Sequence, residues 1–307
     1  MVKTNLEVNI GKLKLKNPVI AASGTFGYAE EYKDLVDINK LGAVITKSIT
    51  LKPRKGNPPP RVIETPQGML NAIGLQNEGV ENFIAEKLLV LKKLKTARIV
   101  SIAGEAIEEF GLLAQRLDKI EDIDAIEINI SCPNIKYGER LFSQEPQATY
   151  DVTKRVREAT GKVIIVKLSP NVTDITEIAK AAENAGADAV SAVNTFTAMV
   201  VDIKTKKPFL ANITGGLSGP AIKPIALRMV REIVKKVNIP VIGMGGIMNA
   251  DDAIEFLLCG AKAVEIGTAN FVNPKASVEI IKGIENYLKN NKISDINKII
   301  GAINEQR

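Results

Sequence analysis

The sequence has no histidine among its 307 residues, so the commonest general base of enzymes is absent. Any proton abstracted at neutral pH must go to a cysteine, a lysine or a carboxylate. Tryptophan is also absent, and aromatic residues make up 4% of the chain against 45% for all hydrophobic residues. A core built from Ile, Val, Leu and Ala suits buried parallel strands better than an aromatic-rich sandwich.

Only two cysteines are present, Cys132 and Cys259. They are too few for a disulfide framework, a tetrahedral zinc site or a self-contained iron–sulfur cluster. No apolar run reaches the roughly 18–20 residues of a membrane span, and the N-terminus has no signal-peptide core. The net charge is +6, but cations and acids are interleaved, which is typical of a solvated surface. We expect a soluble, cytoplasmic protein that binds no metal, membrane or nucleic acid.

Short β-branched runs alternate with amphipathic helical stretches along most of the chain. The runs that predict buried strands are residues 19–22, 43–46, 98–102, 125–130, 163–168, 189–193, 241–243 and 263–266. Residues 6–10 and 13–15 predict a hairpin before them. Helices are predicted at residues 173–185 and 251–258, and they are expected to end at Gly186 and Gly260. Eight βα units in a chain of this size favour a (β/α)₈ TIM barrel, with residues 1–307 as a single domain.

Three connections are too long for simple turns, namely residues 50–76, 133–146 and 195–224. Each follows a predicted strand. We therefore expect long insertions at the C-terminal face of the strands, where barrel enzymes carry their active sites.

Glycine-rich segments also follow predicted strands, at residues 243–247 and at Gly267-Thr268. In a barrel the last two loops commonly form a phosphate site, because backbone N–H groups and a helix dipole face the anion. Residues 214–220 add a third glycine-rich loop. The pattern predicts a site for a phosphorylated substrate or cofactor.

Lys47 and Lys167 each end a predicted strand. A buried lysine is costly unless an anion pairs with it, although a single lysine of this kind often extends to the barrel rim. Two at equivalent positions favour contact with a negatively charged ring or carboxylate. Lys167 could alternatively form a Schiff base, as in barrel aldolases.

Four asparagines lie at strand ends or in the long connections: Asn71, Asn129, Asn134 and Asn194. Their amides donate and accept hydrogen bonds, which suits a planar amide or imide ring, although a single loop asparagine is most often a turn former. Cys132 directly follows the strand at residues 125–130. A lone cysteine is usually a small buried hydrophobe, but this position favours a chemical role.

Nine stretches, in order along nearly the whole chain, match motifs of one known family. They are residues 22–27, 46–50, 68–77, 129–134, 167–170, 194–195, 216–219, 243–247 and 267–268. Several are long and unusual, among them Asn129-Ile130-Ser131-Cys132-Pro133-Asn134. On these residues the chain resembles the FMN-containing catalytic subunit of dihydroorotate dehydrogenase, class 1 type B.

The resemblance implies a (β/α)₈ barrel that binds one FMN per chain and oxidises dihydroorotate to orotate in pyrimidine (UMP) synthesis. It implies FMN contacts from Ser23, Lys47, Ser48, Asn129, Lys167, Val193, Gly219, Gly245, Gly246, Gly267 and Thr268. It implies substrate contacts from Lys47, Asn71, Ala72, Ile73, Gly74, Leu75, Asn129, Asn134, Asn194 and Thr195. At Ser101 the family often has an asparagine, and because serine is shorter, an FMN contact there is left open.

Cys132 matches the catalytic base of the family, which takes the C5 proton of dihydroorotate while a hydride leaves C6 for flavin N5. A thiol with an ordinary pKa of about 8.5 needs only a modest depression for this task. Lys167 is the better candidate to stabilise the reduced, anionic flavin, and Lys47 to bridge the flavin and the orotate carboxylate.

The type B resemblance also implies a partner subunit that carries FAD and a [2Fe-2S] cluster and passes electrons to NAD. A homodimeric core would then sit in a heterotetramer of two catalytic and two electron-transfer subunits. Other readings remain open: a fumarate-linked type A enzyme, a dihydropyrimidine dehydrogenase-like flavoenzyme, a dihydrouridine synthase, a non-flavin aldolase using Lys167, and a non-catalytic FMN-binding protein.

Overall fold

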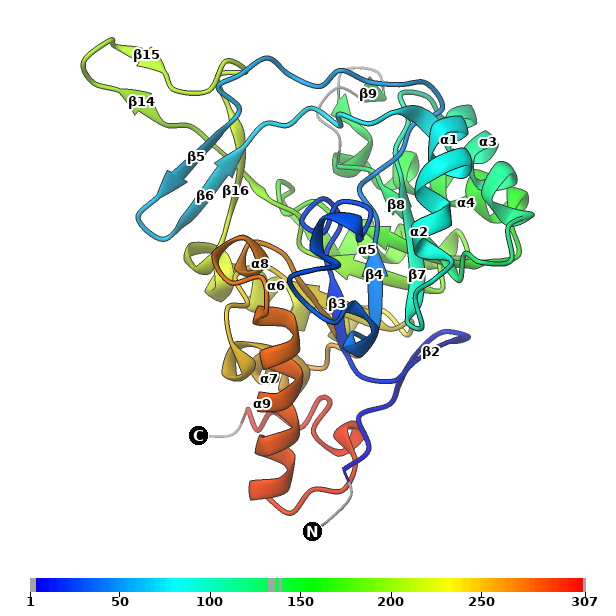
Figure 1. Cartoon of the computed structure of the whole chain (residues 1–307), viewed down its shortest axis with the longest axis vertical. Coiled ribbons are helices and arrows are strands. Elements are labelled where there is room, and N and C mark those ends of the chain that lie inside the picture. The colour runs from blue at the N-terminus through cyan, green and yellow to red at the C-terminus, as the bar shows by residue number, and fades with distance from the viewer. Residues whose placement is uncertain (1–3, 132–135, 138–139, 306–307) are drawn as a thin grey trace.

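A closed barrel of eight parallel strands forms the centre of the computed structural model, which describes residues 4–131, 136–137 and 140–305 (Figure 1). Around the barrel the strands are β11 (Val163–Lys167), β12 (Ala189–Ala192), β17 (Val241–Met244), β18 (Ala263–Ile266), β3 (Val19–Ala21), β4 (Ala43–Ile45), β7 (Ala97–Ile102) and β8 (Ala125–Asn129). Each coincides with a predicted strand to within one residue at either end. The predicted (β/α)₈ barrel is therefore confirmed.

The barrel strands are apolar on both faces because side chains fill the interior and helices cover the outside. Strand β11 illustrates this, since all five of its residues are buried. The core that results is made almost entirely of Ile, Val, Leu and Ala, with a few phenylalanines between the helices and the strands. Polar residues that point into such an interior are costly, so the few that occur call for a chemical explanation.

The helices pack around the barrel (Figure 1). They are α1 (Gly79–Asn82), η3 (Phe83–Lys87), α2 (Leu88–Leu91), α3 (Ile107–Asp118), α4 (Pro146–Ala159), α5 (Ile175–Asn184), α6 (Lys223–Lys236), α7 (Ala250–Leu258), α8 (Ala269–Val272) and α9 (Ala276–Asn290), with short 3-10 turns η1 (Glu30–Tyr32), η2 (Ile38–Lys40), η4 (Phe142–Gln144), η5 (Pro220–Ile222) and η6 (Ile296–Lys298). Both predicted helices are confirmed, as α5 and α7. In the described part of the chain, no helix combines the length and apolarity needed to cross a bilayer.

The starts of α5 and α7 are fixed by capping side chains. The Asp174 carboxylate accepts a hydrogen bond from the Thr176 N–H, so α5 begins two residues later than predicted. Asn249 and Asp252 form a reciprocal capping box at α7, which begins one residue earlier than predicted.

The predicted N-terminal hairpin is present as β1 (Val8–Ile10) paired with β2 (Leu13–Leu15). The segment before it is joined to the segment after α9, because the Asn5 N–H donates to the Ser294 carbonyl at 2.8 Å. These parts lie at the opposite end of the molecule from β5 and β6 (Figure 1).

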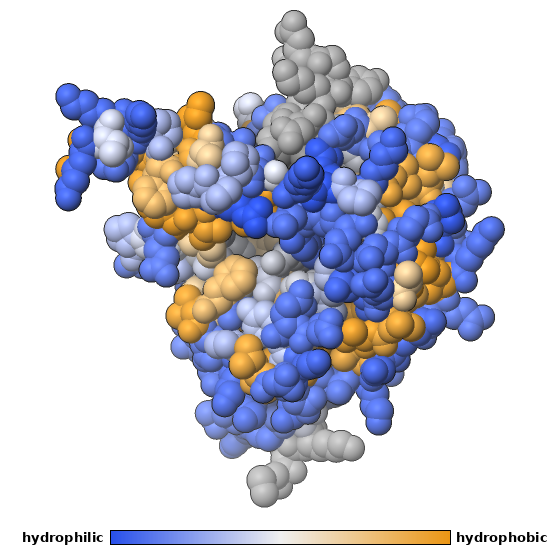
Figure 2. All heavy atoms as spheres, turned by 45° about the horizontal axis from the view of Figure 1, so that its top comes forward, coloured by the Kyte–Doolittle hydropathy of each residue, from blue (hydrophilic) through white to orange (hydrophobic). Residues whose placement is uncertain are grey.

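Two of the three long connections, which come after β4 and β12, combine into a second sheet. Its order is β13 (Phe196–Ala198), β16 (Gly215–Ser218), β6 (Gly68–Asn71) and β5 (Val62–Thr65), with β14 (Val201–Asp202) and β15 (Lys207–Pro208) as a projecting hairpin. The third connection contains β9 (Lys136–Tyr137) paired with β10 (Arg140–Leu141). Apolar side chains gather over the second sheet on the face shown in Figure 2, whereas the tip of its hairpin is hydrophilic.

Candidate functional site

A cavity of about 570 Å³ lies between the carboxyl ends of the barrel strands and the second sheet. Its lining includes the following sequence-predicted site residues: Ser23, Lys47, Ser48, Asn71, Ala72, Ile73, Gly74, Leu75, Asn129, Lys167, Val193, Asn194, Thr195, Gly219, Gly245, Gly246, Gly267 and Thr268. They come from many separate strand ends and loops. The structure thus brings all the predicted residues that it describes around one cavity, apart from Ser101, which was left open.

Ser101 is fully buried beneath the cavity and reaches it through a neighbour. Its Oγ lies 2.8 Å from Ser48 Oγ, and Asn129 Nδ2 donates to Ser48 Oγ at 3.1 Å. The Ser101 N–H donates to Thr46 Oγ1. The serine therefore supports two lining residues instead of lining the cavity itself, which is the consequence of its short side chain.

Lys47 lies half-buried in the cavity wall, with its backbone N–H donated to the Gly27 carbonyl at 2.8 Å. Burial lowers the pKa of Lys47, and the nearby Arg61 guanidinium lowers it further. Among the described residues, no carboxylate lies within ion-pair distance of its ammonium. A cation that is half desolvated and lacks a carboxylate partner favours an anionic ligand.

Lys167 is placed differently, since it is almost fully buried in the cavity floor between two carboxylates. Its Nζ lies 3.3 Å from Glu265 Oε2 and 3.5 Å from Glu127 Oε2. Burial acts to lower the pKa of Lys167, but the charges of Glu127 and Glu265 outweigh it, and the pKa lies above the ordinary value. The Schiff-base alternative needs a neutral amine, and this environment disfavours one.

Three glycines contribute to the wall of the cavity. Gly219, Gly245 and Gly246 all have positive φ angles, of 99°, 117° and 77°. A Cβ on Gly246 would lie 2.9 Å from the Gly219 carbonyl oxygen, and one on Gly219 would lie 2.6 Å from the Cα of Gly68. These positions therefore require glycine, and they keep backbone close to the cavity as a phosphate cradle does.

The eighth-strand loop completes this wall. The Thr268 hydroxyl donates to Ser218 Oγ at 2.8 Å, and a Cβ on Gly267 would touch only Thr25 and Ala22, both at more than 3.5 Å. A side chain at Gly267 would therefore meet only ordinary van der Waals contacts, and Gly267 lines the cavity. The Ser23 hydroxyl, after β3, donates to the Thr46 carbonyl at 2.8 Å and borders the same space.

Three of the predicted asparagines border the cavity from different directions. Asn71 donates to the Gly216 carbonyl at 3.4 Å, which ties β6 to β16. The Asn129 side-chain oxygen accepts from the Ser131 N–H, and that of Asn194 accepts from the Thr195 N–H at 2.8 Å. Each still has hydrogen-bonding capacity for a ligand.

Cys132 and Asn134 lie outside the residues that the structure describes, so their predicted roles stay predictions. Asn129 and Ser131, which precede them in the sequence, both line the cavity. Cys259 lies elsewhere, buried at the end of α7, where burial raises the pKa of its thiol. A raised pKa suits a structural cysteine better than a reactive one.

Several lining residues were missed by sequence reasoning. Arg61 donates to Gln76 at 2.6 Å, and Asn171 donates to the Thr195 carbonyl at 3.1 Å. Arg61 lies in the long connection at residues 50–76, which was expected at this face, but no motif marks either residue. Glu127 and Glu265 did carry a signal, because each is a carboxylate in the middle of an otherwise apolar strand.

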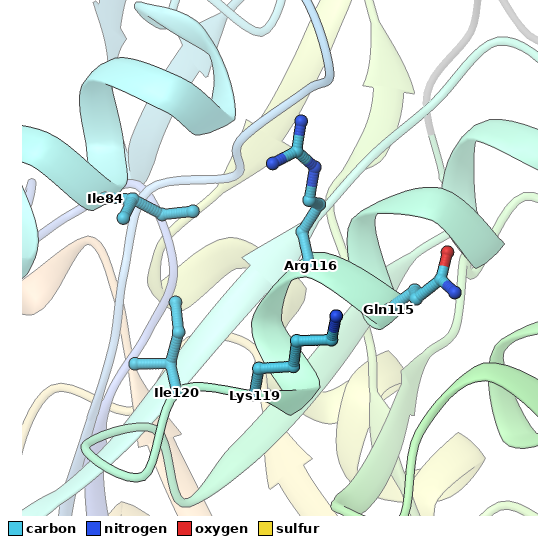
Figure 3. Close-up of a pocket in the computed structure, with 5 residues that line it drawn as sticks. All are labelled: Ile84, Gln115, Arg116, Lys119 and Ile120. Carbon is cyan, nitrogen blue, oxygen red and sulfur yellow. The ribbon is translucent and has the colours of Figure 1, made fainter.

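A second hollow lies on the outside of the barrel between η3 and α3 (Figure 3). It is lined by Ile84, Gln115, Arg116, Lys119 and Ile120. Arg116 is already paired with Glu81 at 2.8 Å. The lining contains no cysteine, serine or carboxylate, so the barrel-mouth cavity remains the better candidate for chemistry. Within the described residues, no group of acidic or cysteine side chains is arranged to hold a metal ion.

The fold and the cavity define a class, that of (β/α)₈ barrel proteins with a ligand-sized cavity at the carboxyl ends of their strands. A more particular assignment comes from comparison with known proteins. The family model described as dihydroorotate dehydrogenase matches residues 5–288. The chain therefore belongs to the dihydroorotate dehydrogenase family.

Similar proteins extend over nearly the whole chain. It is 54% identical over 303 residues to the catalytic subunit of dihydroorotate dehydrogenase B (NAD(+)) from Geotalea uraniireducens, with 99% of both chains covered. It is 56% identical over 303 residues to the subunit of the same name from Geobacter metallireducens, again with 99% of both covered. The corresponding Thermoanaerobacter sp. subunit is 56% identical over 299 residues, covering 97% of this chain and 99% of the relative.

Proposed function

We propose that this chain oxidises dihydroorotate to orotate, as the catalytic subunit of an NAD-linked dihydroorotate dehydrogenase. The observation that carries the proposal is its end-to-end similarity to catalytic subunits of that name. The cavity agrees with it, because the residues predicted for the reaction and described here converge there. We take residues 1–307 as one catalytic domain, in line with the bonds that join its first and last segments.

FMN is the cofactor in this proposal, and the chain's residues fit it. Gly219, Gly245 and Gly246 line the cavity with positive φ angles that favour glycine, so their backbone can come as close to a ligand as a phosphate site requires. The residues that would hold FMN are Ser23, Lys47, Ser48, Asn129, Lys167, Val193, Gly219, Gly245, Gly246, Gly267 and Thr268. When bound, FMN would supply the hydride acceptor that the protein's own side chains lack.

The substrate would be bound by one cation and a set of amides. Lys47 would pair with the carboxylate of dihydroorotate, since its ammonium faces the cavity wall without a described carboxylate partner. Asn71, Asn129 and Asn194 would bind the ring N–H and C=O groups, together with Asn134 outside the described residues. The segment 71–75 and Thr195 would border the same ring.

Cys132 would act as the base that takes the C5 proton of dihydroorotate. Replacing it by serine should leave FMN binding intact but remove most turnover at neutral pH, because a hydroxyl is a far weaker base than a thiol. Cys259→Ser provides the matched control, since that thiol is buried away from the cavity. Equal turnover in Cys132→Ser and Cys259→Ser would contradict the assigned role.

A partner subunit would complete the path of the electrons to NAD. The sequence has two cysteines, too few for an iron–sulfur cluster of its own, so FAD and a [2Fe-2S] cluster would belong to the partner. A homodimeric core, a heterotetramer of two catalytic and two electron-transfer subunits, and a cytoplasmic location are parts of the same proposal.

The visible absorption spectrum tests the proposal. The purified chain should be yellow from bound FMN, and anaerobic dihydroorotate should bleach the flavin band with formation of orotate. A colourless protein that cannot take up FMN would exclude a flavoenzyme, and bound FMN without bleaching would exclude this substrate. Fumarate reduction without a partner would exclude the NAD-linked type.

A further inference from the structure

Three ionisable side chains meet inside the barrel, directly under the cavity. They are Glu127 from β8, Lys167 from β11 and Glu265 from β18, called the buried triad below. The ammonium lies 3.3 Å from Glu265 and 3.5 Å from Glu127. The two carboxylates are fully buried, and the lysine side chain is only 6% exposed. The triad therefore has almost no contact with bulk solvent.

The charges of the triad do not balance when all three groups are ionised, because two carboxylates share one ammonium. Within the described residues, Glu127 Oε1 and Oε2 and Glu265 Oε1 have no hydrogen-bond partner. A buried carboxylate with so little compensation is costly, and taking up a proton removes the excess charge. Geometry alone thus favours a triad that holds one proton on its carboxylates.

Glu265 is the carboxyl that favours this proton. Burial, together with the charge of Glu127, raises the pKa of Glu265 to about 7 against the lowering effect of Lys167. The strands that pair with β18, which are β3 and β17, contribute no ionisable side chain. Strand β12 contributes Ser191, a neutral hydroxyl. Among the described residues, Lys167 and Glu127 are therefore the charged groups that face Glu265.

The triad is also part of the cavity, since Lys167 and Glu265 line it while Glu127 lies behind them. A negative charge that appears in the cavity beside Lys167 competes with the two glutamates for the same ammonium. The compensation available to Glu265 then falls, and its affinity for a proton rises. Coupling between ligand charge and proton uptake follows from this shared ammonium.

We propose that Glu265 takes up one proton from solvent when FMN bound beside Lys167 is reduced, so that the buried triad compensates the new negative charge. This inference rests on the proposed function for the presence of FMN. Two electrons and one proton, delivered together as the hydride of dihydroorotate, convert the flavin to its reduced anion. The Glu265 carboxylate gains the second proton from water and becomes a neutral carboxyl. Glu265 is in this sense a positioning residue, which acts on the flavin through Lys167.

The midpoint potential of the FMN-loaded chain tests the coupling, measured by spectroelectrochemistry between pH 6 and pH 9 without substrate or partner. For a two-electron couple, each proton taken up shifts the potential by about 30 mV per pH unit. Above pH 7 the wild-type slope should therefore be about twice that shown by Glu265→Gln. Glu127→Gln should also lose the extra slope, because it leaves one carboxylate for one ammonium. Glu232→Gln, on the outside of α6, is the control and should keep the wild-type slope. Equal slopes in wild type and Glu265→Gln would overturn the proposal.

Infrared spectroscopy of the FMN-free chain gives an independent measurement. A protonated carboxyl band that is lost as the pH rises from 6 to 8 is expected in the wild type and not in Glu265→Gln, since ordinary carboxyls are already ionised there. If the wild type lacks this band, the inference that the triad holds a proton is wrong. This result needs the wild-type chain alone, so it stands even if a variant fails to fold. Failure to bind FMN would instead overturn the proposed function and the coupling to it, while the infrared band would still decide whether the triad holds the proton.

Discussion

Replacement of Lys167 by methionine should destabilise the barrel in a way that depends on pH. Methionine keeps most of the volume of the lysine stem but removes the ammonium that lies between Glu127 and Glu265. Removing one partner of a buried ion pair costs about 3–5 kcal/mol, because the remaining charge is left without compensation. At pH 8 this corresponds to a fall in Tm of about 5–8 °C for a protein of 307 residues.

The sign of the pH effect follows from the carboxyls that remain. A carboxyl whose pKa is raised in the folded protein stabilises the fold fully below its ordinary pKa, and this contribution is lost as the pH rises through the folded value. Glu265 already has a pKa of about 7 with Lys167 present, and without the ammonium it will lie higher. The difference in Tm between wild type and Lys167→Met should therefore be small at pH 5 and large at pH 8.

The assay is thermal unfolding followed by circular dichroism, at pH 5 and pH 8 and at a fixed scan rate, on FMN-free protein. Lys235→Met is the control, because it removes an ion pair of 2.8 Å to Glu305 in which both side chains are about half exposed. It should have no measurable effect at either pH. An equal fall in Tm at both pH values for Lys167→Met, or no fall at pH 8, would refute the account of the buried charges.

Three further substitutions test other parts of the structure. Gly246→Ala should weaken FMN binding more than tenfold in an equilibrium titration, because the φ of Gly246 is 77° and a Cβ there would lie 2.9 Å from the Gly219 carbonyl oxygen. Gly161→Ala is the control, since Gly161 has open space around it, and this variant should bind FMN as the wild type does. Asn249→Ala should lower the free energy of unfolding by about 1 kcal/mol through loss of the α7 cap, measured by urea denaturation. Lys47→Met should raise the KM for dihydroorotate at least tenfold, since a charge-assisted hydrogen bond is worth about 1.5–3 kcal/mol.

The barrel strands could be predicted from the sequence because their pattern is local. Runs such as Val-Ile-Ile-Val at 163–166 are apolar and β-branched, and a strand buried on both faces needs nothing more to be recognised. Glycine positions were equally readable, since Gly245 and Gly246 follow a strand directly and adopt the backbone angles that glycine permits.

The second sheet could not be predicted in the same way. Strand β6 pairs with β16, with Asn71 opposite Gly216, although the two segments are far apart in the chain. Both strands are short and only partly buried, and β16 contains two glycines, so neither shows the alternation that marks an amphipathic strand. Their pairing depends on the barrel that brings the two connections to the same face.

The site shows the same division between local and distant information. That Lys167 needs an anion could be inferred from its place at the end of an apolar strand. Which anion it meets could not, because Glu127 and Glu265 come from strands whose neighbourhood is set only when the barrel closes. The sequence predicted a negatively charged ring or a carboxylate at Lys167, and in the structure two carboxylates of the chain itself lie there.

The buried triad gives a physical reason why a barrel without histidine can still hold a proton near neutral pH. An imidazole that binds a proton goes from neutral to positive, whereas a carboxyl goes from negative to neutral. In the buried triad, which has one ammonium and two carboxylates, protonation of one carboxylate changes the net charge of the triad from −1 to zero. A buried site tolerates the neutral end state better than a net charge of either sign. A glutamate paired with Lys167 is therefore better suited than histidine to offset a negative charge that arises in this cavity, because its pKa is already about 7 before that charge is present.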